Sequence, residues 1–222
     1  MSRLAVAAGL SEAGNVLRET GKRIIGVPEV AGSLAGSRRP KRLRIRVWIL
    51  RDEDGKPVAT PADVEPGLEE ARRVLQTQAA IELLQPSGPV ATLPVAAPPE
   101  ALDSPCAEGS WRADFGPGGA FFRRFVEPAG PPGRGTPITV FVVRDVLGKA
   151  GCSLGPLVNY VTVDLKAFTG RTRRVLVHEL GHACGLPHSK AQDNLMLPKS
   201  MGDLLLPWQV AVFRSSGHVT YR

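Results

Sequence analysis

The stretch 178–188 constrains this 222-residue chain more than any other, because it holds three of the four histidines. His178 and His182 are four residues apart, so on a helix both side chains leave the same face. Two imidazoles on one face can each bind one zinc ion at about 2.0–2.1 Å. Glu179 lies slightly aside of them, where it would reach a water on the metal rather than the metal itself.

A third histidine joins this pair only if the helix ends and the chain turns back. His188 lies too far along a continuous helix to meet the other two. Gly185 stands where helices commonly end in a left-handed residue, and Pro187 prevents the helix from resuming. We therefore expect His188 to be the third ligand. Three protein ligands leave a fourth position for water, which is the pattern of catalytic zinc sites.

The order of these residues resembles the signature of a known clan of enzymes. His178, Glu179, His182, Gly185 and His188 occupy every fixed position of H-E-x-x-H-x-x-G-x-x-H, the signature of the metzincin zinc metallopeptidases. A chance match of five fixed positions is far less probable than a chance H-E-x-x-H. The motif resemblance covers residues 178–198, and a looser match of element order extends it over most of 43–222.

The metzincin signature is followed by a methionine turn, and Met196 stands eight positions after the third histidine. The resemblance implies that Met196 lies beneath the metal. A methionine between two leucines is also ordinary core filler, so this role rests on the resemblance alone. Ser189 follows the third histidine, a feature shared with the matrixin branch of the clan.

The hydrophobic patterning predicts an α+β chain. Strands are expected over 43–50, 81–84, 138–143 and 157–163, and helices over 66–79, 172–185 and 207–214. This order is similar to a compact metzincin. The resemblance therefore implies a zincin fold: a twisted mixed sheet packed on two helices, an active-site cleft, and a small C-terminal subdomain with the Met-turn and a terminal helix.

Two segments carry weaker signals. Residues 1–40 are expected to form an N-terminal extension, either a pro-segment or a linker, before a metallopeptidase catalytic domain over 41–222. Whether the extension is removed or inhibitory stays open. Residues 86–136 are rich in Pro and Gly, which predicts a long and only partly ordered insertion. Phe121, Phe122 and Phe125 suggest one short amphipathic helix within it.

The net charge of +7 raises the alternative of a basic nucleic-acid-binding protein. Arg42, Arg44 and Arg46 alternate with apolar residues, which is more typical of a half-buried strand with one solvated face. We therefore expect no nucleic-acid partner. No run of about 18 apolar residues is present, so no membrane span is expected. The short apolar run Leu4–Leu10 is a weak signal peptide, and a secreted or a cytoplasmic location both remain open.

Three cysteines are an odd number, which argues against a dense disulfide framework. Cys184 is interpreted as buried helix filler, because a fourth strong ligand would close the zinc site. Cys106 invites comparison with the inhibitory cysteine of matrixin propeptides, but it lies inside the domain rather than in an N-terminal segment. The sequence leaves the disulfide state of Cys106, Cys152 and Cys184 open.

The sequence predicts a zinc-dependent endopeptidase, a hydrolase that acts on peptide or protein substrates as a monomer. It would use one catalytic zinc ion and Glu179 as general base. The turn 52–55 lacks the remaining ligands of a calcium loop, so calcium is not indicated. By analogy with the clan, an extended substrate would lie along an edge strand. The candidates for that strand are Leu157, Val158, Asn159 and Tyr160.

Two other functions stay open from the sequence. One is a zinc-binding, peptidase-like module without turnover, which the intact Glu179 argues against. The other is the basic nucleic-acid-binding protein described above. The substrate and the cleavage preference cannot be read from the sequence.

Overall fold

The computed structural model describes residues 39–85, 88–106, 111–127, 135–168, 172–198 and 202–221. The predicted extension over 1–40 lies almost wholly outside the described residues. The strands are β1 (Lys41–Arg51), β2 (Ile81–Leu84), β3 (Ala91–Ala96), β4 (Asp103–Pro105), β5 (Ile138–Val143), β6 (Asp145–Leu147), β7 (Gly151–Ser153), β8 (Tyr160–Asp164) and β9 (Val219–Tyr221). The helices are α3 (Pro61–Ala79), α4 (Pro99–Leu102), α5 (Pro117–Arg123), α6 (Val175–Ala183) and α7 (Pro207–Arg214), with 3₁₀ turns η1 (Trp111–Phe115) and η2 (Leu165–Phe168).

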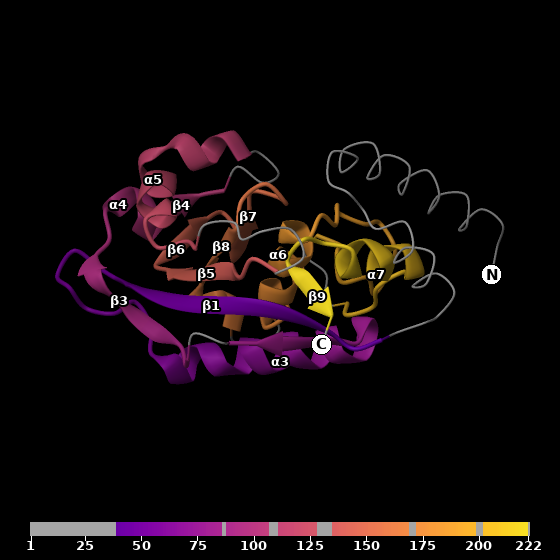
Figure 1. Cartoon of the computed structure of the whole chain (residues 1–222). Helices are drawn as coiled ribbons and strands as arrows, with labels where there is room; N and C mark the ends of the chain where they lie inside the picture. The colour runs from indigo at the N-terminus through magenta and orange to yellow at the C-terminus, as the bar shows by residue number, and fades with distance from the viewer. Residues whose placement is uncertain are drawn as a thin grey trace.

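A mixed sheet forms the centre of the domain, in the order β2-β1-β5-β8-β7. β1, β2, β5 and β8 run parallel, and β7 pairs antiparallel with β8. β3 pairs with the second half of β1, while β9 pairs antiparallel with its first residues. Figure 1 shows β1 as the long strand that links the two ends of the molecule. The α+β fold with a mixed sheet is thus confirmed.

Strand β1 shows the alternation that the sequence predicted. Leu43, Ile45 and Ile49 are fully buried, whereas the intervening arginines are half-buried. Arg42 forms an ion pair with Glu82, and Arg46 forms one with Glu127. The basic run is therefore one solvated face of a core strand, partly neutralised by carboxylates.

Each face of the sheet carries its own hydrophobic core. Helices α3 and α6 pack together on one face, where the larger cluster joins the inward side chains of β1, β5 and β8. α4, α5 and the short β4–β6 ladder cover the other face near β5 and β8 (Figure 1). The C-terminal region adds α7, which contacts α3. Within the described ranges, no helix combines the length and the hydropathy needed to cross a bilayer.

Helix α3 begins five residues before the predicted start at Pro66. Thr60 is the N-cap residue, and its side chain and that of Asp63 form a reciprocal capping box, with Pro61 in the first turn. Pro66 therefore lies inside the helix. The predicted start lies at the second of the two prolines because the cap at Thr60 was not recognised in the sequence.

The predicted insertion over 86–136 is more ordered than expected. Its described parts contain β3, α4, β4, η1 and α5, and α5 includes Phe121 and Phe122 of the predicted helix, whereas Phe125 follows it in a turn. Backbone pairing of β3 with β1 stabilises a strand whose own sequence, with Pro94, is a weak strand former. Other bounds also differ: β8 begins at Tyr160 rather than residue 157, and α6 spans 175–183 rather than 172–185. By contrast, α7 has its predicted bounds.

One disulfide, Cys106–Cys152, joins the end of β4 to β7. The helices α4 and α5 and the strand β4 form a covering segment on one face of the sheet. The disulfide links this covering segment to β7, the outer strand of the sheet. The remaining cysteine, Cys184, is buried just after α6, in agreement with the packing role predicted for it. Cys106 is thereby engaged inside the domain, which does not fit a role as an inhibitory cysteine.

Replacing both Cys106 and Cys152 by serine is expected to lower the free energy of unfolding by about 2–4 kcal/mol. The bridge spans a sequence separation of 46, so its loss returns considerable chain entropy to the unfolded state. Denaturant titration followed by circular dichroism measures the change. Reduced wild-type protein is the matched control and should behave like the double variant. Identical midpoints for oxidised and reduced wild type would contradict the prediction.

Candidate metal centre

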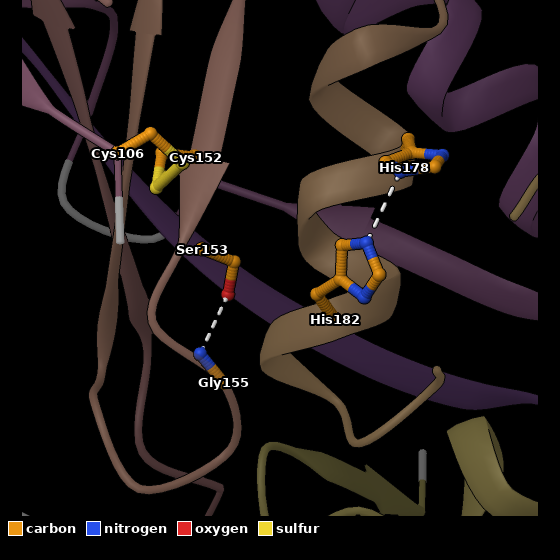
Figure 2. Close-up of a disulfide and its surroundings, with 6 residues drawn as sticks. All are labelled: Cys106, Cys152, Ser153, Gly155, His178 and His182. Atoms are coloured by element: carbon orange, nitrogen blue, oxygen red, sulfur yellow. Dashed lines mark hydrogen bonds between the residues drawn. A yellow bond between two sulfur atoms is a disulfide. The ribbon is translucent and has the colours of Figure 1, made fainter. Parts of the chain in front are cut away.

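The three predicted histidine ligands come together in the structure. One ligating atom from each of His178, His182 and His188 lies within 4.8 Å of the other two. Helix α6 carries His178 and His182 on one face, with their Nε2 atoms 3.1 Å apart (Figure 2). His182 is buried and His188 is exposed. One side of the cluster is therefore inside the protein and the other is open to solvent.

Backbone carbonyls fix the tautomer of both helical imidazoles. Nδ1 of His178 lies 2.7 Å from the Leu195 carbonyl oxygen, and Nδ1 of His182 lies 2.7 Å from that of Leu186. A carbonyl oxygen can only accept a hydrogen bond, so each Nδ1 must carry the proton. In a neutral imidazole the lone pair is then on Nε2.

Two lone pairs that face each other at 3.1 Å repel unless a cation lies between them. A tetrahedral zinc ion with bonds of about 2.0–2.1 Å separates two ligand nitrogens by about 3.3–3.4 Å, close to the observed spacing. Neutral Nε2 donors with Nδ1–H bound to carbonyls are also the usual arrangement at zinc sites. The donor set therefore fits one zinc ion.

The turn after α6 explains how His188 returns to the helix. Gly185 has φ +96°, a conformation that is costly for a residue with a Cβ. The Gly185 N–H donates to His182 O and the Leu186 N–H donates to Gly181 O, both at 2.9 Å. These two bonds form a Schellman motif. The same turn directs the Leu186 carbonyl at His182, so one local structure ends the helix and orients a ligand.

Met196 packs beneath this part of the helix. It is fully buried, and a Cβ added at Gly181 would lie 2.7 Å from its sulfur, so the thioether touches the helix between the two histidines. The Ser189 N–H donates to the Met196 carbonyl, which ties the residue after His188 to the same loop. Met196 is thus packed against α6, and its assignment as the Met-turn residue stays a prediction.

Two buried amides hold the Met196 loop and were not predicted from the sequence. Asn194 and Gln209 exchange two side-chain hydrogen bonds, of 2.8 and 3.1 Å, and both are almost fully buried. Asn194 Oδ1 also accepts from the Met196 N–H. The pair anchors to α7 the loop whose Leu195 carbonyl binds His178. A polar Gln209 on the apolar face of a short helix was the available signal.

Glu179 is 6% exposed and lies against strand β7. A Cβ built on Gly151 would come within 2.8 Å of Glu179 Cγ and 2.6 Å of Val175 Cγ1. Residue 151 must therefore be glycine for β7 to approach α6 this closely. Nothing in the local sequence marked Gly151, because the need for it arises only where the strand meets the helix.

The prediction that residues 157–160 form the sheet edge is wrong. β8 lies between β5 and β7, so β7 is the outer strand at this end. Leu157, Val158 and Asn159 precede β8 in a turn. Tyr160 packs on Phe122 and Phe141 on the face away from α6, so it does not face the histidines. The apolar run over 157–163 could not reveal that a shorter strand, Gly151–Ser153, pairs with β8 on its outer side.

A network of ion pairs holds the start of α6. Glu70 on α3 accepts hydrogen bonds from Arg73 and from Arg174, the N-cap residue of α6, at 2.8–2.9 Å. Asp203 pairs with both arginines and precedes Leu204, which pairs with the loop before Met196. An arginine at a helix N-terminus is unfavourable for the helix dipole, and the two carboxylates offset that cost. The two arginines hold the pKa of Glu70 at about 2.

The comparisons with known proteins agree with this geometry. The matrixin family model matches residues 160–203, well under half of the chain, and this segment contains all three histidines, Glu179, Gly185 and Met196. The resemblance to metzincin-type zinc metallopeptidases is thus confirmed over the site. No protein of curated function matches the sequence.

Two solved structures are similar in overall arrangement. Archaemetzincin from Methanopyrus kandleri has a TM-score of 0.43 and 14% identity, with 79% of this chain and 88% of that chain covered. Metalloproteinase-II from Bacteroides fragilis has a TM-score of 0.40 and 12% identity, with 80% of this chain covered. The chain spans 56% of the length of the second protein. Both likenesses are too distant to assign residue roles.

Replacing His182 by alanine should remove most of the bound zinc, because one of three ligands is lost and water replaces imidazole only weakly. Metal analysis of the purified protein by mass spectrometry measures the stoichiometry, which should be one zinc per chain for the wild type. Lys190→Ala, an exposed change close to the third ligand, is the control. Full zinc occupancy in both His178→Ala and His182→Ala would refute the assignment.

Glu70→Gln should lower stability at neutral pH by on the order of 1 kcal/mol, since the arginines are partly exposed and solvent screens the pairs. The folded pKa of Glu70, about 2, lies below its ordinary value of 4.5. The ion pair therefore stabilises the fold above about pH 4.5, and this contribution is lost as the pH falls toward 2.

Denaturant unfolding of both proteins at pH 7 and pH 3 tests this. The difference in the free energy of unfolding between wild type and Glu70→Gln should be smaller at pH 3 than at pH 7. Glu69→Gln, an exposed change on the same helix, is the control and should be nearly neutral at both. A difference in the free energy of unfolding that grows on acidification would show that Glu70 acts in another way.

Proposed function

We propose that this protein is a zinc-dependent endopeptidase that hydrolyses peptide bonds of protein or peptide substrates. The observation that carries the proposal is the pair of Nε2 atoms 3.1 Å apart, each of which holds the lone pair of a neutral imidazole whose Nδ1 donates to a carbonyl. His188 completes three ligands on the solvent side, and Glu179 follows a ligand directly. Three imidazole ligands with an open side are the donor set of catalytic rather than structural zinc.

His178, His182 and His188 would hold the zinc ion. When bound, zinc supplies a Lewis acid that polarises the scissile carbonyl and makes a water molecule more acidic. Glu179 takes the proton of the attacking water and later gives it to the leaving amine. The contact with Gly151 keeps its side chain between α6 and β7. The carbonyls of Leu195 and Leu186 keep the two helical imidazoles in the tautomer and orientation that binding requires.

The substrate would bind along β7 rather than along residues 157–160. β7 is the terminal strand of the sheet, and among the described strands only β8 pairs with it. An extended peptide can add to such an edge through main-chain hydrogen bonds, and because the three residues of β7 are buried, it must displace what covers them. Because Gly151 of β7 touches Glu179, a peptide on the outer side of β7 passes close to the general base. The edge position and the proximity to Glu179 support this assignment.

The two alternatives receive less support. A metal-binding module without turnover has no need of a glutamate next to a ligand and packed against an edge strand. A nucleic-acid-binding face would require free arginines, but Arg42 and Arg46 are paired with carboxylates on the same sheet face. No observation favours either alternative over hydrolysis.

Glu179→Gln is expected to keep its zinc and to lose about 10²–10⁴-fold in cleavage rate, because it leaves the three ligands in place and removes the proton acceptor. Purified wild-type and variant proteins are incubated with a denatured protein mixture, with and without a chelator, and new termini are mapped by mass spectrometry. Glu69→Gln serves as the matched control. A cleavage rate in Glu179→Gln equal to that of the wild type, or cleavage by the wild type after complete zinc removal, would overturn the proposal.

A further inference from the structure

The peptide unit between Leu195 and Met196 connects one of the three histidines to a buried pair of amide side chains. Its carbonyl oxygen accepts from Nδ1 of His178 at 2.7 Å, and its N–H donates to Oδ1 of Asn194 at 2.9 Å. This peptide bond is trans, so its C=O and N–H point in opposite directions. The hydrogen bond that holds the N–H toward Asn194 therefore also sets the direction in which the carbonyl faces His178.

Backbone N–H groups fix the orientation of both amide side chains. Oδ1 of Asn194 accepts from the Met196 N–H, and Oε1 of Gln209 accepts at 2.8 Å from the N–H of the N-cap residue of α7. An N–H group can only donate, so each of these side-chain atoms must be the oxygen. The two amides then exchange their hydrogen bonds of 2.8 and 3.1 Å with matched donors and acceptors.

Burial makes this arrangement rigid and strengthens its effect on the histidine. Asn194 is 1% exposed and Gln209 is fully buried, so turning either amide away from its partners would leave polar atoms unsatisfied in the interior. Hydrogen bonds in series also polarise one another where the dielectric is low. The bond to Asn194 makes the Leu195 carbonyl a better acceptor, and a stronger bond at Nδ1 of His178 makes its Nε2 a more basic metal ligand.

We propose that Asn194 and Gln209 are positioning residues that raise the zinc affinity of the site through His178 rather than through the other two histidines. The proposal rests on the zinc centre of the proposed function, but not on peptide cleavage. His182 is held by the Leu186 carbonyl, which belongs to the turn after α6 and not to the loop that the amides hold. Helix α7 thus contributes to metal binding although it carries none of the three histidines.

The next peptide unit of the loop is held independently of the amide pair. Its carbonyl, that of Met196, accepts from the Ser189 N–H beside the third histidine. Its N–H, that of Leu197, donates to the backbone carbonyl of Asn194 at 3.1 Å. A change of the Asn194 side chain leaves both of these backbone bonds possible. We therefore expect its effect to fall on His178.

Asn194→Ala tests the proposal in a double-mutant design. The metal-free proteins are titrated with zinc in competition with a chromophoric chelator, which gives the zinc dissociation constant. In the wild-type background this constant should rise by about 10-fold, the lower end of the range found when a hydrogen-bond partner of a metal ligand is lost. It should rise by a similar factor in the His182→Ala background, where His178 is still present. In the His178→Ala background it should hardly change.

Two results of this titration would overturn the proposal. One is an unchanged zinc dissociation constant in Asn194→Ala. The other is an equal rise in the His178→Ala and His182→Ala backgrounds, because the loop would then act on the site as a whole.

A control on α7 separates positioning from stability. Val210→Ala removes two buried methyl groups next to Gln209, so it should lower the melting temperature but keep the zinc dissociation constant. Gln209→Met keeps the length of the side chain and removes its polar groups. It should raise the zinc dissociation constant, and it replaces Asn194→Ala in the double-mutant design if that variant does not fold. An equal rise in Val210→Ala would count against the proposal.

Cleavage of a denatured protein mixture by the same proteins lets the two proposals fail separately. Zinc dissociation constants that follow the expected pattern, without cleavage by the zinc-loaded wild type, support the positioning role and refute the endopeptidase. Cleavage by the wild type, with no change of the zinc dissociation constant in Asn194→Ala, supports the endopeptidase and refutes the positioning role. A wild-type protein that binds no zinc would refute both.

Discussion

Two hydrogen bonds from imidazole to backbone carbonyl are the constraint on which the candidate site depends. Leu195 O and Leu186 O hold Nδ1 of His178 and His182 and thereby turn both Nε2 lone pairs to the same point. Each carbonyl comes from a different local structure. The Gly185 turn supplies the Leu186 carbonyl, and the loop held by Asn194 and Gln209 supplies the other. The C-terminal part of the chain thus matters to the metal ligands chiefly through its backbone.

Strand β7 is the second element on which several features of the candidate site depend. Gly151 brings it against Glu179, Cys152 bonds it to the covering segment, and its outer side ends the sheet. A strand of three residues has few backbone pairs of its own, and the disulfide compensates by fixing it to β4. In the proposed function this strand would position the general base and the peptide backbone together.

Elements with strong local patterns were predictable from the sequence. The alternation of β1, the apolar run of β5 and the proline start of α7 all led to the observed elements. Weak local patterns led to errors. Two nearby prolines hid the true start of α3 at Pro61, and a high Pro and Gly content made the ordered region around β3 and α5 resemble a loose insertion. There, pairing with β1 and burial outweigh poor propensity.

The sequence by itself determined which three histidines come together, because the spacing of His178, His182 and His188 around Gly185 allows few backbone paths, and the chain follows one of them. Only the tertiary structure decided which strand is the outer one, that Cys106 meets Cys152, and that Gly151 lies against Glu179. The physical reason is the range of the contacts. Metal-ligand spacing is set within one helix and one turn, whereas strand order and the packing of a strand on a helix join segments that no local pattern connects.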